Sequence, residues 1–426
     1  MNTADRHVRG VPLAVAALLG AGATAAWCHG AAPGAVPLRA DDVPAAPRIG
    51  RVRDDIRPTP PPASLYQDVA EAYVDAVQWK ARVQEAAAIA FAMDVSVLAQ
   101  WGFPDGGAPT LQVFAAPSLD WTLFRSAHRG TGSVQIAYNA IGYPVVQTGA
   151  ALQSNLGLIT PINDYSTRFL NFSRLTYTQA TPDHRWLFTL GQYPFYGFDG
   201  NAYLGNQQLN FNNYLFAQNA TQTYLMTGLG AFVQFNATGT IQLATGLQAT
   251  NNYPGETITL DDAGADCCAW FGYLQWSPSV PGLGSAQYSF SYFDTPAIPA
   301  QPATRNWSVN AVQNLDDRWA VFARANGADG FVTQIKNAYA LGVALNNPLK
   351  RAATDQFAVA VGLSEAADPP VTPPGARNEK TIEVYWTWTL FGGLLITPAV
   401  QVIFDPALDP RRANATVLSL RTTFRF

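Results

Sequence analysis

The last ten residues of the chain, VLSLRTTFRF (Val417–Phe426), decide its fold class. Apolar or weakly polar side chains occupy every second position back from the terminus, and arginine, threonine and serine fill the positions between them. Successive side chains of a strand point to opposite faces, so the segment predicts a strand with one apolar face and one basic, polar face. Such a strand fits a soluble sandwich, whose core takes the apolar face, or a membrane barrel, whose apolar face meets lipid.

The composition favours the membrane barrel. Of the 426 residues, 48% are hydrophobic and only 13% are charged, whereas soluble domains contain about 25% charged residues. Neutral polar residues suit a water-filled lumen, and Trp and Tyr suit the membrane interfaces. The formal net charge is -4 without a basic stripe, which argues against nucleic acid as a partner. The four histidines are scattered, so we expect neither a metal site nor a catalytic site.

Three segments precede the strand pattern. Residues 1–30 combine a basic start, an apolar stretch and small residues at a cleavage position, which predicts a secretory signal peptide. Residues 31–63 are rich in Pro and Ala and lack periodicity, which predicts a linker. Residues 64–92 carry apolar residues at spacings of three and four, which predicts an amphipathic, coiled-coil-like helix. Three uses of this helix are open: a coiled coil between protomers, which we slightly favour, a helix in the barrel mouth, or a helix against the barrel floor.

From about Leu111 onward, apolar residues recur at every second position. Twelve segments show this pattern clearly, among them SVQIAYNAI (133–141), TIEVYWTWTL (381–390) and PAVQVIFDP (398–406), and weaker ones bring the total to roughly sixteen. Each is about 9–11 residues long, which suits a tilted strand that crosses hydrocarbon. The chain is therefore predicted to be all-β, with a transmembrane antiparallel β-barrel of about 16 strands over residues 100–426.

The alternation of side chains also predicts which residues line the lumen. In the segment 381–390, Glu383 and Tyr385 lie on the polar face. An arginine on the lipid side of the bilayer midplane costs about 2–4 kcal/mol, so Arg324 is predicted to point into the lumen. The same alternation places Arg421 and Thr423 on the inner wall.

Two groups of short motifs occur in a fixed order along the chain. The first group is Gly191 at a strand end, FDGN (198–201) and FNN (211–213); the second is Glu383, TP (397–398), FDP (404–406) and the run from Arg421 to the terminus. Taken together and in this order, the motifs resemble the OprB-type carbohydrate-selective porins of Gram-negative outer membranes. The resemblance spans most of residues 165–426.

The resemblance implies a barrel in the Gram-negative outer membrane, through which neutral mono- or oligosaccharides diffuse passively. It also implies that the barrel contacts outer-membrane lipid and lipopolysaccharide, and that the barrel assembly machinery recognises Phe426 as its signal. We expect no enzymatic activity and no cofactor. A coiled coil over residues 64–92 would hold the protomers of a homotrimer together. The alternative hypothesis is an outer-membrane export channel for a polysaccharide, whose N-terminal helix engages periplasmic partners.

The loop that follows Gly191 is long, rich in amides and flanked by aromatic residues, which predicts an inward-folded constriction. Its candidate residues are Asp199, Asn201, Tyr203 and Gln207. The alternative, of equal weight, is an ordinary extracellular loop in which Asp199 and Asn201 serve turn geometry. The adjacent residues Cys267 and Cys268 could form a vicinal disulfide, bind a metal, pair between chains or be incidental.

Overall fold

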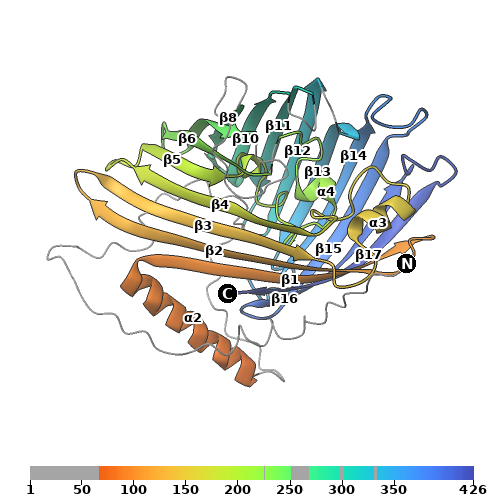
Figure 1. The fold of residues 1–426 in the computed structure, drawn as a ribbon. Helices are drawn as coiled ribbons and strands as arrows, with labels where there is room; N and C mark the ends of the chain where they lie inside the picture. The colour runs from red at the N-terminus through yellow and green to blue at the C-terminus, as the bar shows by residue number, and fades with distance from the viewer. Residues whose placement is uncertain (1–66, 225, 251–267, 298–301, 331–332) are drawn as a thin grey trace, which may run out of the picture. The chain divides into compact units, whose positions relative to one another are not determined.

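The computed structural model describes residues 67–224, 226–250, 268–297, 302–330 and 333–426. The predicted signal peptide and linker lie outside these residues. The described chain forms one antiparallel sheet that closes on itself, because β1 (Ile89–Phe103) pairs with β2 (Thr110–Ser126) on one side and with β17 (Asn414–Arg425) on the other (Figure 1). Closure gives hydrogen-bond partners to the backbone groups of the first and last strands, as a structure surrounded by lipid requires.

The remaining strands follow in chain order around the barrel, each paired with the next. They are β3 (Gly130–Gly142), β4 (Phe169–Ala180), β5 (Trp186–Tyr193), β6 (Gly228–Asn236), β7 (Ile241–Ala249), β8 (Cys268–Trp276), β10 (Gly284–Thr295), β11 (Thr304–Asn314), β12 (Trp319–Gly330), β13 (Ile335–Asn346), β14 (Gln356–Ala366), β15 (Glu379–Phe391) and β16 (Leu394–Phe404). The two-residue β9 (Ser279–Val280) pairs with β10 in the turn after β8. The prediction of a closed barrel of about 16 strands is confirmed.

The predicted assignment of side chains to the two faces agrees with the structure. In β15, Glu383 and Tyr385 are buried inside the barrel, whereas Ile382 and Trp388 are 37% and 36% exposed on the outside. In β17, Arg421 and Thr423 are buried, and Leu418 and Leu420 face outward. The outer face is therefore an apolar surface, and the inner face carries the polar residues.

The helix ends and the first strand begins earlier than predicted. Helix α2 spans Gln67–Ala87, and β1 starts at Ile89, inside the range predicted as helical. Ala88 lies between them with a φ of 53°, which ends the helix. The sequence that follows is rich in alanine, but β1 pairs with β2 from Ile89 onward, and this pairing overrides the local helix propensity. The barrel starts at residue 89, not at residue 100.

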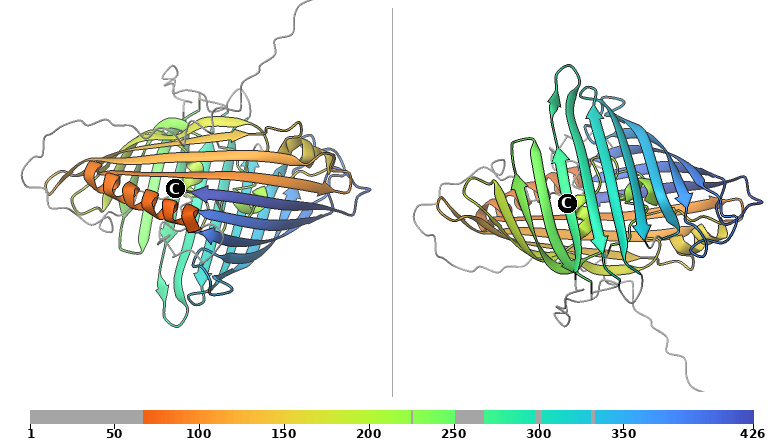
Figure 2. Two further views of the ribbon diagram at one scale, coloured as in Figure 1. Left: turned by 90° about the horizontal axis from the view of Figure 1, so that it is seen from below. Right: turned by 90° about the horizontal axis from the view of Figure 1, so that it is seen from above.

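Helix α2 lies at the end of the barrel that carries the C-terminus (Figure 2). The ring of Tyr73 packs edge-on against Phe391 and Phe424, and its hydroxyl donates a 3.2 Å hydrogen bond to the carbonyl of Arg425. The ammonium of Lys80 lies 5.2 Å from the ring centroid of Phe426. These are the contacts of a helix against the barrel floor, one of the three uses that the sequence leaves open. Among the described residues, no helix combines the length and apolar character needed to cross a bilayer.

The two ends of the barrel differ in their connections. Short turns join the strands at the end near α2, such as residues 181–185 between β4 and β5 and residues 315–318 between β11 and β12. Long connections lie at the opposite end, after β3, β5 and β14. This asymmetry is typical of outer-membrane barrels, whose short turns face the periplasm.

Candidate functional site in the barrel lumen

Two long connections fold into the lumen (Figures 1 and 2). Loop A is residues 143–168, between β3 and β4, and contains α3 (Gly149–Asn155). Loop B is residues 194–224, after β5, and contains the 3-10 helix η2 (Phe195–Phe198) and the short helix α4 (Tyr214–Ala217). Loop B is the stretch for which the sequence leaves an inward constriction and an extracellular loop open. Its side chains pack among inner-wall residues from β12 to β16, which is the inward arrangement.

Small residues on the inner wall make room for loop B. Most inward positions of β13 and β14 are alanine or glycine, and Phe211, Leu215 and Phe216 of the loop pack into the same buried cluster as these alanines. A Cβ added at Gly362 would lie 2.5 Å from Cδ2 of Leu215. Burial of such apolar side chains contributes about 1.5–3 kcal/mol each. The wall and the loop are therefore complementary in size.

An aromatic cluster fixes the start and the end of loop B to the opposite part of the barrel. Phe198 stacks on Phe271 of β8, with ring centroids 4.1 Å apart, and Phe195 lies against Phe293 of β10 at 5.7 Å. Tyr224, at the end of the loop, contacts the same Phe293 at 4.3 Å. Offset and edge-on pairs of this kind add about 0.5–1.5 kcal/mol each beyond the burial of their area.

Charged residues of the wall bind the backbone of loop B. The fully buried carboxylate of Glu383 accepts hydrogen bonds from the backbone N–H groups of Asn212, at 2.8 Å, and Asn213, at 2.9 Å. The guanidinium of Arg421 donates to the carbonyls of Gln207 and Asn210 and to the Asn212 side chain. Thr423 donates from its hydroxyl to the carbonyl of Gln208. Hydrogen bonds to charged groups contribute about 1.5–3 kcal/mol each, so these residues act as anchors of the loop.

Arg324 anchors loop B at a second place. Its guanidinium donates to the carbonyls of Leu204 and Gln218, both at 2.6 Å, and to the side chain of Asn310 at 2.9 Å. Asn310 in turn donates to Asp199 at 3.0 Å. The acidic residue of the loop and the arginine of the wall are thus connected through the Asn310 amide.

Asn201 combines the two roles that the sequence leaves open for it. Its side-chain oxygen accepts from the backbone N–H groups of Tyr203 and Leu204, both at 2.9 Å, which is turn chemistry. The same residue is buried in the lumen, and the Tyr203 ring stacks 5.2 Å from Phe322 on β12. The Asx turn therefore forms inside the barrel.

Loops A and B are bonded to each other. The backbone N–H of Asp164 in loop A donates to the side chain of Gln207, and Gln218 donates to the Asp164 carboxylate at 3.2 Å. The Tyr214 backbone N–H donates to the carbonyl of Pro161 at 3.0 Å. Burial raises the pKa of the Asp164 carboxyl to about 7, although the bond from Gln218 and the charge of Arg324 lower it. The two loops form one polar layer across the lumen.

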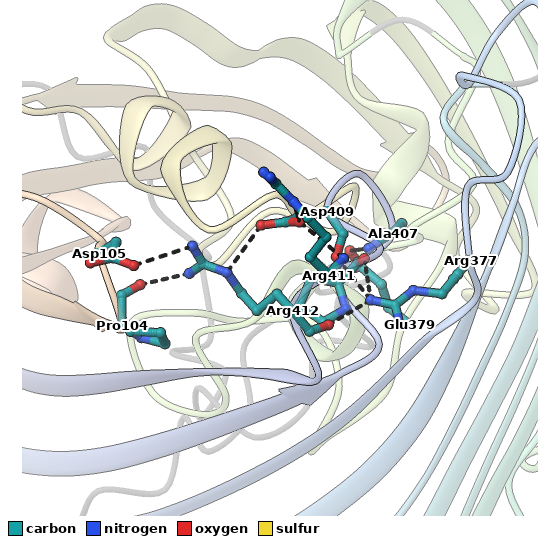
Figure 3. A network of polar contacts seen from close by, with 9 residues as sticks. Pro104, Asp105, Arg377, Glu379, Ala407, Asp409, Arg411 and Arg412 are labelled. Carbon is teal, nitrogen blue, oxygen red and sulfur yellow. Dashed lines mark hydrogen bonds and ion pairs between the residues drawn. The ribbon is translucent and has the colours of Figure 1, made fainter.

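A network at the barrel mouth joins the connections after β1, β14 and β16 (Figure 3), and Glu379 links it to loop A. The Glu379 carboxylate accepts from the backbone N–H groups of Ile159, at 2.8 Å, Thr160, at 3.0 Å, and Ala407, at 3.1 Å. Arg377 donates to three carbonyls of the turn after β16, those of Pro406, Asp409 and Arg412. Arg412 continues to the turn after β1, where it donates to the carbonyl of Pro104 at 2.6 Å.

The structure brings all the predicted lumen residues together around loop B. Most of their polar atoms hold the loop in place, and whether they also contact a solute stays a prediction. Glu379, Arg377 and Asp164 are not among the predicted residues. A signal for Glu379 does exist in the sequence, since it lies four residues before Glu383 and so on the same face of the strand.

Two further predicted features are placed by the structure. The backbone of Phe426 exchanges two hydrogen bonds with Met93, at 2.8 and 2.9 Å, so the last residue is part of the closing seam. Its reading by an assembly machinery stays a prediction. Cys268, the first residue of β8, is disulfide-bonded. Cys267 lies outside the described residues.

Comparison with known proteins assigns the family. Porin AaxA of Chlamydia abortus is 34% identical over 343 residues, which cover 78% of this chain and 76% of that protein. Porin AaxA of Chlamydia pneumoniae is 30% identical over 350 residues, covering 80% of each. The model of the OprB family of carbohydrate-selective porins matches residues 268–426.

The fold comparison agrees. The high-pH structure of Pseudomonas putida OprB aligns with a TM-score of 0.67 at 16% sequence identity, and covers 83% of this chain and 97% of that chain. Porins of this kind are channels in the outer membrane, and a closed antiparallel barrel with an apolar outer face is the structure that this location requires. The chain belongs to the OprB family of carbohydrate-selective porins.

Proposed function

We propose that the protein lets small neutral sugars diffuse passively across the outer membrane. The observation that carries this proposal is the inner wall of β3 to β7, where the buried polar side chains are amides and hydroxyls. These residues are Gln135, Asn139, Asn171, Ser173, Thr176, Thr178, Thr189, Gln192, Gln234 and Gln248. A wall built of such uncharged groups does not favour an ion over a neutral solute, and where its groups meet the pore they offer a sugar hydrogen bonds in place of those to water.

The lumen charges are neutralised locally, which also supports a neutral solute. Arg425 pairs with Asp94 at 3.1 Å across the seam between β17 and β1. Glu383 and Arg421 bind the backbone of loop B, as described above. A lumen without a strong field of one sign does not concentrate ions of the opposite sign.

The two inward loops disfavour the polysaccharide export channel. An exported polymer needs a clear path, but loops A and B are bonded to each other and to the wall. The helix α2, which that hypothesis assigns to periplasmic partners, packs through Tyr73 and Lys80 against its own barrel. We keep passive sugar diffusion as the proposal.

Liposome swelling with matched solutes tests the proposal. We expect proteoliposomes to swell faster in a neutral monosaccharide than in an anionic sugar acid or a cationic amino acid of similar size. Equal rates for all three, or faster entry of a charged solute, would contradict it. The double variant Asp199→Ala, Asn201→Ala should change sugar entry more than the heat stability of the barrel, and Gln78→Ala on the outer side of α2 serves as the control.

A further inference from the structure

The mouth network of Figure 3 contains a fastening for loop A. Ile159 and Thr160 of the loop present two consecutive backbone N–H groups to the carboxylate of Glu379, and both side chains are buried. Thr160 also donates from its hydroxyl to Ser364 on β14 at 2.9 Å. All these contacts cross from a loop that follows β3 to strands that come more than 200 residues later.

The fastening is supported from the opposite side. The Ala407 N–H reaches the same Glu379 oxygen as Ile159, and the Leu408 N–H donates to the carbonyl of Gly157 at 2.8 Å. Arg377 holds the turn that carries both of these groups by its bonds to three of the turn's carbonyls. Glu379 is thus clamped between loop A and the turn after β16, and it is fully buried.

Loop A supports loop B through the bonds of Asp164 and Pro161. If loop A leaves the wall, the lumen loses both the volume of loop A and the support of loop B. We propose that Glu379 is the positioning residue that fastens loop A inside the barrel, and that this fastening sets the cross-section of the pore. The inference deepens the proposed function, on which it rests only for the identity of the solute.

The substitution Glu379→Gln tests the fastening. A glutamine has one accepting oxygen and one donating NH₂ group. Its oxygen can still accept from Ile159 and Ala407, which share one carboxylate oxygen, but its NH₂ group then faces the Thr160 N–H, and the negative charge is lost. The loss of charge-assisted bonds should make the detached form of loop A at least about tenfold more populated. We expect a larger single-channel conductance in KCl, and entry of larger sugars in the swelling assay.

Lys380→Gln is the matched control. Lys380 is the next residue of β15, its side chain is 63% exposed, and it pairs with Asp405 at 3.0 Å on the outer side. This variant removes one charge from the same part of the strand without touching loop A. Its conductance should equal that of the wild type.

A reversible lock separates fastening from general damage to the barrel. Thr160→Cys and Ser364→Cys place two thiols where hydroxyls now lie 2.9 Å apart, a separation from which a disulfide can form. In the Glu379→Gln background, oxidation should return the conductance to the wild-type value and reductant should raise it again. Reductant added to the wild type controls for the disulfide at Cys268.

The outcomes decide the inference. A folded Glu379→Gln porin with wild-type conductance overturns it, and so does an increase that the oxidised lock does not reverse. If Glu379→Gln does not fold into a heat-modifiable barrel, Arg377→Gln takes its place, and wild-type conductance in that variant overturns the inference equally. A pore that conducts KCl but excludes every sugar refutes the proposed function while leaving the fastening intact.

Discussion

Replacing Glu383 by glutamine should loosen the centre of loop B while the barrel stays closed. The carboxylate now binds two consecutive backbone N–H groups, those of Asn212 and Asn213, in a position with no exposure to solvent. A glutamine can accept only one of them and turns its own NH₂ group toward the other. The loop therefore keeps one neutral bond in place of two charge-assisted ones.

The size of the effect follows from these bonds. A buried N–H left without an acceptor costs about 1–3 kcal/mol, and the remaining bond falls from about 1.5–3 to about 0.5–1.5 kcal/mol. Together the free energy that holds this part of the loop should fall by about 2–5 kcal/mol. Since 1.4 kcal/mol corresponds to a factor of ten, the open form should become roughly 30-fold to 4,000-fold more populated.

Hydrogen exchange of the peptide around residues 208–217 measures this directly. The amide protection of that peptide should fall by the same factor, while strand amides of β15 and β16 keep their protection. Glu365→Gln is the control, because Glu365 is a carboxylate of the neighbouring strand that accepts from Asn337 at 2.7 Å. If the protection of loop B falls less than threefold relative to this control, the anchoring role of Glu383 is refuted.

Three further predictions concern other contacts of the lumen and of α2. Gly362→Ala places a methyl group 2.5 Å from Leu215 and should lower the free energy that holds loop B against the wall by about 1–3 kcal/mol. In the control Gly142→Ala the new methyl has no atom within 4 Å, so the hydrogen exchange of loop B should stay unchanged. Burial raises the pKa of Asp164 to about 7, so the folded loop favours the protonated acid. The stability of the folded loop should therefore fall as the pH rises from about 4 through 7. Asp164→Asn should abolish this pH dependence of the loop's amide protection, measured between pH 5 and 8. Tyr73→Ala deletes two ring contacts and one hydrogen bond of α2. It should raise the hydrogen exchange of α2 without changing conductance; a change in conductance would show that α2 takes part in permeation.

The barrel was predictable because lipid imposes a simple rule on every strand. Leu418, Leu420 and Ile382 must face hydrocarbon, and Arg421 and Glu383 must not, so the alternation is visible in the sequence itself. The start of β1 was not predictable in the same way. The residues around Ala88 fit a helix as well as a strand, and only pairing with β2 and β17 decides between them.

The role of the lumen residues required the structure. Glu383 and Asn212 are 171 residues apart, and neither carries a periodic signal that connects them. The alanines of β13 and β14 look merely apolar in the sequence, and their small size acquires meaning only when Phe211 and Leu215 are seen against them. Charged residues that the sequence assigns to the inner wall are indeed there, but most of their bonds go to loop B.

The seam between β1 and β17 has a consequence for biogenesis. Asp94 and Arg425, which pair across this seam, are separated by 331 residues. The strand β1 can therefore pair with β17 only after β17 has been synthesised. Every shorter nascent chain has two open edges that are prone to aggregation, and the high contact order makes closure slow. Translation must therefore finish before the barrel can close, and a chain that lacks β17 cannot form the pairing with β1 that closes the wall.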